Sequence, residues 1–231
     1  MKRIVEPELL DTLPPDNPRA VGSRRDLHRI NAMMRNHVIM AEALGKHWPG
    51  AAPGRITELG AGDGCFLYRV AKRLAPRWPN VRATLLDLQK NVTPDTFANL
   101  TALGWRPEIL VADVFDWPHT FELDGVVIAN LFLHHFEPAR LATLLGIISR
   151  RTELFVAIEP RRGEMPLFLT HCLWAFGCND VTRHDAVVSV RAGFDGDELS
   201  ALWPDHENWQ LTENRTGLAS HLFIARKIKH G

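Results

Sequence analysis

The chain has 231 residues, 45% of them hydrophobic, and its formal net charge at pH 7 is zero. This length and apolar fraction are sufficient for one sizeable core, so we expect a globular chain built on one main domain. The zero net charge and the lack of a long basic run argue against a nucleic-acid substrate, which usually requires a basic surface. A continuous apolar run of membrane-spanning length is also absent, and we therefore expect no membrane span.

The N-terminal segment and the cysteines bear on the cellular compartment. The first seven residues, MKRIVEP, lack the apolar core of a signal peptide. Cys65, Cys172 and Cys178 do not have the pattern of a disulfide framework, and the spacing of the last two is not typical of a zinc site. We expect buried structural thiols, no metal and a cytoplasmic protein.

The first expected element is a long helical arm. Prolines place a loop at residues 13–18, and Ser23 is a suitable N-cap for a helix over residues 24–48. The apolar residues that recur at helical spacing in this helix are Leu27, Ile30, Met34, Val38, Met40 and Leu44. Such a helix can pack on the following domain, close over a ligand as a lid, or do both. We therefore divide the chain into a helical arm or lid at residues 1–48 and a domain at residues 49–231.

The segment at residues 56–65 carries the most specific pattern in the chain. It is an apolar strand end containing Glu58, followed by Gly60, Gly62 and Gly64 and then by a helix-like run. Alternating glycines let the backbone turn tightly and let a ligand lie against main-chain N–H groups. The N-terminus of the next helix adds a partial positive charge. A nucleotide-like ligand is therefore expected here.

The kind of nucleotide is indicated by two departures from the dinucleotide-binding fingerprint. Cys65 stands where that fingerprint has its third glycine. The carboxylate of Glu58 would not stabilise a pyrophosphate, because both groups are negatively charged. A carboxylate suits a cationic ligand with an amino group instead. The sequence ELGAGDG closely resembles motif I of the class I S-adenosylmethionine (SAM) methyltransferases. The resemblance implies SAM as cofactor, S-adenosylhomocysteine (SAH) as product, and cofactor contacts from Glu58, Gly60, Ala61, Gly62 and Gly64.

The next three strands should bring polar side chains to the same loop. Residues 81–88 form a short apolar run ending in Asp87, at the position where Rossmann-like sheets use an acid to hold ribose hydroxyls. A strand at 109–115 carries Asp113, which the resemblance places at the adenine amino group. The apolar run at 124–130 is typical of a strand buried on both faces of a parallel sheet. The residues expected to complete the cofactor set are Leu88, Asp113, Val114 and Asn130.

The remaining elements complete an α/β pattern. They are helices at 95–103 and 138–151, a fifth strand at 154–160, and strands at 209–213 and 221–226. No helix fits between the last two strands, so they should pair antiparallel. The expected fold is a Rossmann-like, mostly parallel sheet of seven strands with a C-terminal antiparallel hairpin. It resembles the class I methyltransferase fold over about residues 50–229.

An acceptor site is expected beyond the carboxyl ends of the strands, where ligands bind in open α/β sheets. A helical insertion at residues 161–206, between strands five and six, should build a wall there together with the arm. Its aromatic and aliphatic side chains suit an apolar or aromatic small molecule, and packing on the core explains most of them equally well. At the end of strand five, Glu159 can bind an acceptor hydroxyl or pair with Arg161, and we favour the ion pair. The candidate substrate residues are Glu159, Arg161, Trp174 and Arg183.

Methyl transfer from a sulfonium to oxygen requires positioning and removal of the acceptor proton. Histidine is the usual base near neutral pH, and the candidates are His134 and His135 after strand four and His184 in the insertion. We favour His135 and His184, although a structural hydrogen-bonding role is the commoner one for any single histidine. Adjacent side chains on a helix diverge by about 100°. Asp185 is therefore expected to bind an arginine or a backbone group rather than His184.

A finer resemblance lies outside motif I. Residues 23–31 and 182–194 are similar to segments of bacterial methyltransferases found beside type III polyketide synthases. This similarity implies O-methylation of a phenolic or polyketide acceptor. The alternatives are C-methylation of a similar acceptor, a nicotinamide-dependent oxidoreductase and a non-catalytic SAM-binding module. The missing third glycine and the C-terminal hairpin disfavour the oxidoreductase, and the sequence leaves both a monomer and a homodimer open.

Overall fold

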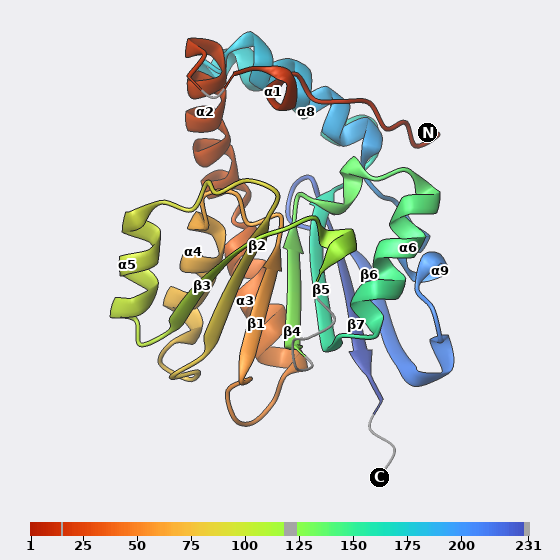
Figure 1. Ribbon diagram of the computed structural model, residues 1–231. Helices are drawn as coiled ribbons and strands as arrows, with labels where there is room; N and C mark the ends of the chain where they lie inside the picture. The colour runs from red at the N-terminus through yellow and green to blue at the C-terminus, as the bar shows by residue number, and fades with distance from the viewer. Residues whose placement is uncertain (15, 118–123, 229–231) are drawn as a thin grey trace.

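One seven-stranded sheet organises the part of the chain that this computed structural model describes, residues 1–14, 16–117 and 124–228. The strand order is β3-β2-β1-β4-β5-β7-β6 (Figure 1). The strands are β1 Arg55–Leu59, β2 Arg82–Asp87, β3 Arg106–Val111, β4 Asp124–Asn130, β5 Thr152–Pro160, β6 Trp209–Thr216 and β7 Ser220–Lys227. The first five pair in parallel, whereas β7 is antiparallel to both β5 and β6. The predicted mostly parallel sheet with a C-terminal hairpin is confirmed.

The central strands are apolar because both of their faces are covered. In β4, Val126 and Ile128 belong to one hydrophobic cluster, and Val127 and Ala129 belong to a second one on the opposite face. All four side chains are fully buried. Alternate residues of a strand point to opposite faces, so a continuous apolar run is what a central parallel strand needs.

Helices cover both faces of the sheet and also stand over the carboxyl ends of the parallel strands (Figure 1). The helices are α1 Leu9–Thr12, α2 Pro18–Met34, α3 Asn36–His47, α4 Cys65–Leu74, α5 Pro94–Ala102, α6 Pro138–Ser149, α7 Glu164–His171, α8 Asp180–Ala192 and α9 Glu198–Leu202. Short 3-10 turns are η1 Val114–Asp116, η2 Leu133–His135, η3 Cys172–Phe176 and η4 His206–Asn208. Helices α3, α4 and α5 pack on one hydrophobic cluster, and α6 and α9 pack on the other. No helix among the described residues is long and apolar enough to cross a membrane.

The arm differs from the single helix expected over residues 24–48. Helix α2 begins earlier, at Pro18, because the side chain of Asn17 caps it by accepting a hydrogen bond from the backbone N–H of Arg19. The expected cap, Ser23, lies inside α2, where its hydroxyl is hydrogen-bonded to an insertion residue. The arm then breaks at Arg35, whose φ of 56° is left-handed, and α3 follows. Helix α3 packs on the sheet domain, whereas α2 rises above the sheet to contact α8 (Figure 1).

The insertion is anchored to the sheet at the point where α8 ends. The backbone N–H of Phe194 donates to the carbonyl of Pro160, the last residue of β5. A Cβ on Gly193 would lie 2.2 Å from that carbonyl oxygen, so only glycine permits this approach. At the other end of α8, the side chain of Asn179 caps the helix, and its backbone N–H donates to Asp26 of α2. The arm and the insertion are therefore joined above the strand ends.

Candidate functional site

The glycine turn after β1 has the backbone that its sequence requires. Gly60, Gly62 and Gly64 have φ values of 66°, 53° and 74°, which favour glycine strongly. A Cβ on Gly60 would lie 2.3 Å from the ring of Phe132, whereas a Cβ on Gly62 would meet nothing within 4 Å in the described structure. The turn is held by the N–H of Ala61, which donates to the end of β2. The space beside Gly62 lets a ligand approach the main chain.

Glu58 places a buried carboxyl directly behind this turn. The residue is 2% exposed, and its Oε2 atom has no hydrogen-bond partner among the described residues. Burial, followed by the negative charge of Asp63, raises the pKa of Glu58 well above its usual range, and a backbone hydrogen bond at Leu67 offsets this only in part. A buried carboxyl without a full set of partners favours a bound cation.

The acidic residue predicted at the end of β2 lies against the same turn. Asp87 accepts hydrogen bonds from the backbone N–H groups of Gly62 and Gln89, both at 2.9 Å. Next to it, Leu88 is 67% exposed. The structure therefore brings Asp87 together with the glycines, as its place in the sequence predicted.

The remaining predicted cofactor residues lie at the neighbouring strand ends. Asp113 follows β3 and caps η1 by accepting from the N–H of Phe115, whereas Val114 is buried in the core. At the end of β4, Asn130 accepts a hydrogen bond from Asn36 of α3. Asp113 is thus placed near the edge of the expected crevice, and Asn130 links the arm to the sheet.

Helix α2 reaches the glycine turn from above, through a histidine that the sequence analysis did not single out. The Nε2 atom of His28 lies 3.1 Å from the carboxylate of Asp63. One turn further on, the side-chain oxygen of Asn31 is buried and has no hydrogen-bond partner in the described structure. The arm therefore contacts the loop that carries Gly62 and Gly64 through His28.

A second cluster of polar side chains forms where β4 and β5 end. Glu159 is fully buried, and its carboxylate accepts hydrogen bonds from the N–H groups of Phe132 and Leu133 at 3.1 and 2.9 Å. It also lies 2.8 Å from Nδ1 of His134. The predicted ion pair of Glu159 with Arg161 is wrong. The carboxylate is hydrogen-bonded instead to backbone N–H groups at the start of η2 and to the imidazole of His134. The guanidinium of Arg161 donates to the carbonyl of Leu218 instead.

The two adjacent histidines of η2 have opposite electrostatic environments. Although burial favours the neutral ring, the hydrogen bond with Glu159 and the negative charges of Glu159 and Glu8 raise the pKa of His134 to about 9. Desolvation and then the positive charge of His134 lower the pKa of His135 to about 4. Glu8 itself has a lowered pKa, because the histidines and Ser189 outweigh the effect of its burial. His134 is therefore a buried cation at neutral pH, and His135 is neutral.

Glu8 is a second site residue that the sequence analysis missed. It belongs to the N-terminal segment, where no periodic or motif signal marks it. Arg3 pins this segment over η2 by donating to the carbonyls of Phe136 and Ala192 at 2.9 and 2.7 Å. The hydroxyl of Ser189 on α8 donates to the Glu8 carboxylate. The N-terminal segment therefore covers the histidine cluster.

His184, the other favoured histidine, lies on the same side but is more exposed. Its Nδ1 atom is 2.9 Å from Asp185, so the expectation that these neighbours would diverge is wrong, because their rotamers turn the two groups toward each other. The carboxylate of Asp185 also accepts from the backbone N–H groups of Leu9 and Leu10, and such backbone bonds were expected. Asp185 thus fixes the first turn of α1 on α8.

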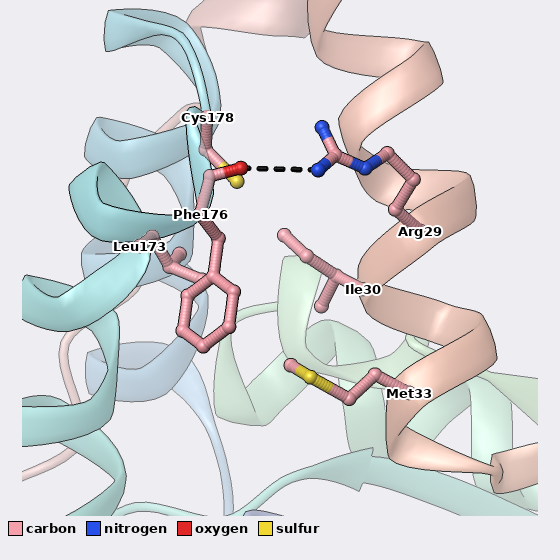
Figure 2. Close-up of a pocket in the computed structure, with 6 residues that line it drawn as sticks. All are labelled: Arg29, Ile30, Met33, Leu173, Phe176 and Cys178. Atoms are coloured by element: carbon pink, nitrogen blue, oxygen red, sulfur yellow. Dashed lines mark hydrogen bonds between the residues drawn. The ribbon is translucent and has the colours of Figure 1, made fainter.

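A cleft of about 200 Å³ opens between α2 and the insertion. Figure 2 shows that its side chains point toward one another from these two elements; they are Arg29, Ile30, Met33, Leu173, Phe176 and Cys178. At one end, the guanidinium of Arg29 donates to the carbonyl of Phe176 at 3.1 Å. Two predicted substrate residues, Trp174 and Arg183, lie on the exposed surface outside this lining. On the insertion side, Leu173 and Phe176 supply the apolar lining of this cleft.

Comparison with known proteins identifies the fold. No protein-family model and no curated protein sequence matches the chain. The plantazolicin methyltransferase BpumL in complex with SAH matches with a TM-score of 0.66 at 11% identity, covering 92% of this chain and 92% of that chain. The mitomycin 7-O-methyltransferase MmcR gives a TM-score of 0.61 at 19% identity, covering 94% of this chain and 60% of that chain. An O-methyltransferase family protein from Burkholderia thailandensis gives 0.58 at 18%, covering 92% and 62%.

These identities are low, so the likeness concerns the arrangement of the chain. The fold is the class I methyltransferase fold, as the sequence predicted. This chain spans almost all of BpumL but less than two thirds of the other two proteins. BpumL has also been solved with SAH together with a monoazolic desmethylPZN analog.

Proposed function

We propose that this chain is a SAM-dependent methyltransferase of a small molecule, and that it methylates an oxygen of a phenolic or polyketide acceptor. The observation that carries the proposal is the buried carboxyl of Glu58, one oxygen of which has no hydrogen-bond partner in the described structure. A cation is the ligand that such a carboxyl lacks, and SAM carries both an ammonium and a sulfonium group. Support also comes from a protein of the same fold that was solved with SAH.

The cofactor would lie across the strand ends with each part near a suitable side chain. Glu58 would bind the amino group, and the open main chain at Gly62 would lie against the ligand. Asp87 would accept from the ribose hydroxyls, and the exposed side chain of Leu88 is free to cover the nucleoside. Asp113 would meet the adenine amino group. This assignment uses the residues that motif I and the following strands predicted.

The reaction needs a positioned acceptor and a base, since the sulfonium already activates the methyl group. In the structure, Glu159 orients His134 through Nδ1, which leaves Nε2 directed at Glu8. An acceptor hydroxyl that replaces Glu8 would remove one of the two carboxylates that raise the pKa of His134. The ring could then lose its proton and serve as general base through Nε2. We therefore assign the base to His134 in preference to His135 and His184.

The arm would act as the lid of this site. Helix α2 contacts the glycine turn through His28 and also lines the apolar cleft with Ile30 and Met33. One element therefore faces both the expected cofactor side and the expected acceptor side. The apolar lining suits an aromatic acceptor, and residues 1–48 would close over a SAM-binding domain at residues 49–231.

Calorimetry with SAH and NADH tests the cofactor assignment. We expect SAH to bind and NADH not to bind. Replacing Asp87 by alanine should weaken SAH binding by about 1.5–3 kcal/mol, the typical value of hydrogen bonds to a charged group. Glu108→Ala, at an exposed position of β3, is the matched control and should bind as the unmodified chain does. Preferential NADH binding would contradict the methyltransferase assignment, and unchanged affinity of Asp87→Ala would remove Asp87 from the ribose site.

Hydrogen exchange tests the lid. Binding of SAH should slow amide exchange in α2, because the ligand would add contacts to a helix that stands above the sheet. Helix α3 provides an internal comparison, since it is already packed on the core and should change little. Equal exchange of α2 with and without SAH would leave this helix with a packing role alone.

A further inference from the structure

We propose that Glu8, His134 and His135 form a binding site for a transition-metal dication such as Zn²⁺. One candidate ligand atom from each of these residues lies within 4.8 Å of the others. Two come from η2 and one comes from the N-terminal segment, so a bound ion would join the arm to the sheet domain. These contacts alone define the site, and metal binding there would not require methyl transfer.

The separation of the two best-defined ligand atoms suits a shared ion. Nε2 of His134 lies 3.5 Å from Oε1 of Glu8. This distance exceeds the usual 2.7–3.2 Å of an N–H···O hydrogen bond. Two ligands of a tetrahedral zinc ion, each bound at about 2.0–2.1 Å, are separated by about 3.3 Å. The observed spacing is therefore closer to two corners of a metal site than to a direct hydrogen bond.

The ring of His134 is prepared for such a role by its other nitrogen. Nδ1 is 2.8 Å from the buried carboxylate of Glu159, which directs the Nε2 atom toward Glu8. A histidine whose second nitrogen donates to a carboxylate is the usual arrangement around protein-bound zinc. His134 is 3% exposed, and Nε2 has no hydrogen-bond partner among the described residues. A metal ion that displaced the Nε2 proton would therefore find a buried nitrogen and a carboxylate already facing each other.

The charges around the cluster also favour a dication. Two carboxylates lie against His134: Glu8 is 3.5 Å from Nε2, and Glu159 is 2.8 Å from Nδ1. Arg3 is the nearby opposing cation, and its guanidinium is already bound to backbone carbonyls.

Three protein ligands leave a fourth position for water or for an acceptor oxygen, which is the pattern of catalytic rather than structural zinc. An ion here would lower the pKa of a hydroxyl bound to it. His134 would then act as a ligand, and the metal would take over the ionisation of the acceptor that the histidine performs in the metal-free protein.

Zinc binding by the full chain tests the site without any methyl acceptor. The protein is stripped with a chelator, dialysed and titrated with Zn²⁺ by calorimetry, and Co²⁺ is used as a spectroscopic probe of ligand number and type. We expect one tight equivalent, with Co²⁺ showing a low-coordinate spectrum that lacks thiolate bands. Glu8→Gln and His135→Ala should abolish tight binding, and Glu159→Gln, which removes the outer carboxylate, should weaken it by about 10–100-fold.

The control variants address the other possible cluster, His28, Asp63 and Cys65. His28→Ala and Cys65→Ser should bind zinc as tightly as the unmodified chain. Circular dichroism confirms folding, and Glu8→Gln is nearly isosteric, so at least one ligand variant should stay intact. Absence of tight zinc binding would overturn the proposal. Binding that survives Glu8→Gln and His135→Ala, or that is lost in His28→Ala, would overturn it as well.

Discussion

Replacing His134 by asparagine should lower kcat by about 10²–10⁴-fold, the usual range for loss of general-base assistance. The asparagine amide can still donate to Glu159 from the place of Nδ1, so the buried carboxylate keeps a partner. What disappears is Nε2, the atom that would accept the proton of the methyl acceptor. Affinity for SAH, measured by calorimetry, should be unchanged. The rate is measured by single-turnover transfer from SAM to a phenolic acceptor, on protein treated with a chelator so that loss of a metal cannot contribute.

The pH dependence separates a base from a structural residue. The deficit of His134→Asn should shrink at high pH, where a phenol ionises unaided near its pKa of about 10. Because Glu8 helps to raise the pKa of His134, Glu8→Gln should move the acid limb of the rate profile to lower pH. His184→Ala is the matched histidine control and should retain most activity. Full activity of His134→Asn, or a large loss confined to His184→Ala, would contradict the assignment to His134.

Local pattern was sufficient to predict the sheet and the glycine turn that follows β1. The central strands are apolar on both faces, so their sequence marks them without tertiary information. The glycine turn is equally local, because three left-handed residues in five positions can hardly be anything but glycine. Asp87 could be predicted because it ends β2, which pairs in parallel with β1. The carboxyl ends of the two strands therefore lie side by side, next to the glycine turn.

The polar cluster around His134 depends on contacts that local sequence does not encode. Glu8 meets Ser189, which lies 181 positions further along the chain, and neither residue belongs to a periodic pattern. The same applies to Glu159, for which Arg161 was the obvious partner in the sequence. Glu159 binds the backbone N–H groups at the start of η2 instead, and these groups lie next to it only because β4 and β5 pair in the sheet.

The break in the arm illustrates a different limit. Arg35 adopts a left-handed conformation that a non-glycine residue reaches only when its surroundings hold it there. Continuous helical spacing through this position therefore predicted one helix. The side chain of the next residue, Asn36, is buried and bonds to both Asn130 and Ser220, and this fixes where α3 starts. The information lies in the packing partners rather than in helix propensity.

Replacing Glu58 by glutamine should have opposite effects on stability and on cofactor binding. Without cofactor, the folded chain holds a carboxyl whose pKa is raised by burial and by Asp63, so its ionised form is disfavoured in the fold. Removing the ionisable group should stabilise the free protein near neutral pH, because the fold no longer has to keep a buried carboxyl protonated. The same change should weaken SAH binding by about 1.5–3 kcal/mol, because the ligand ammonium loses its charged partner. Thermal unfolding and calorimetry measure the two effects.

The sign of the pH dependence follows from the raised pKa. Below the unfolded pKa of about 4.5 the carboxyl is protonated in both states, and Glu58 carries no penalty. As the pH rises toward the folded pKa, the unfolded state ionises first, so the free protein loses stability relative to Glu58→Gln. Bound SAH should reverse this trend, because its ammonium favours the ionised carboxyl, and binding should then release protons that calorimetry in different buffers detects. Glu42→Gln, at an exposed position of α3, should show none of these effects. A glutamine variant that binds SAH normally would mean that the buried carboxyl serves the fold alone and that the cation it lacks is not the cofactor.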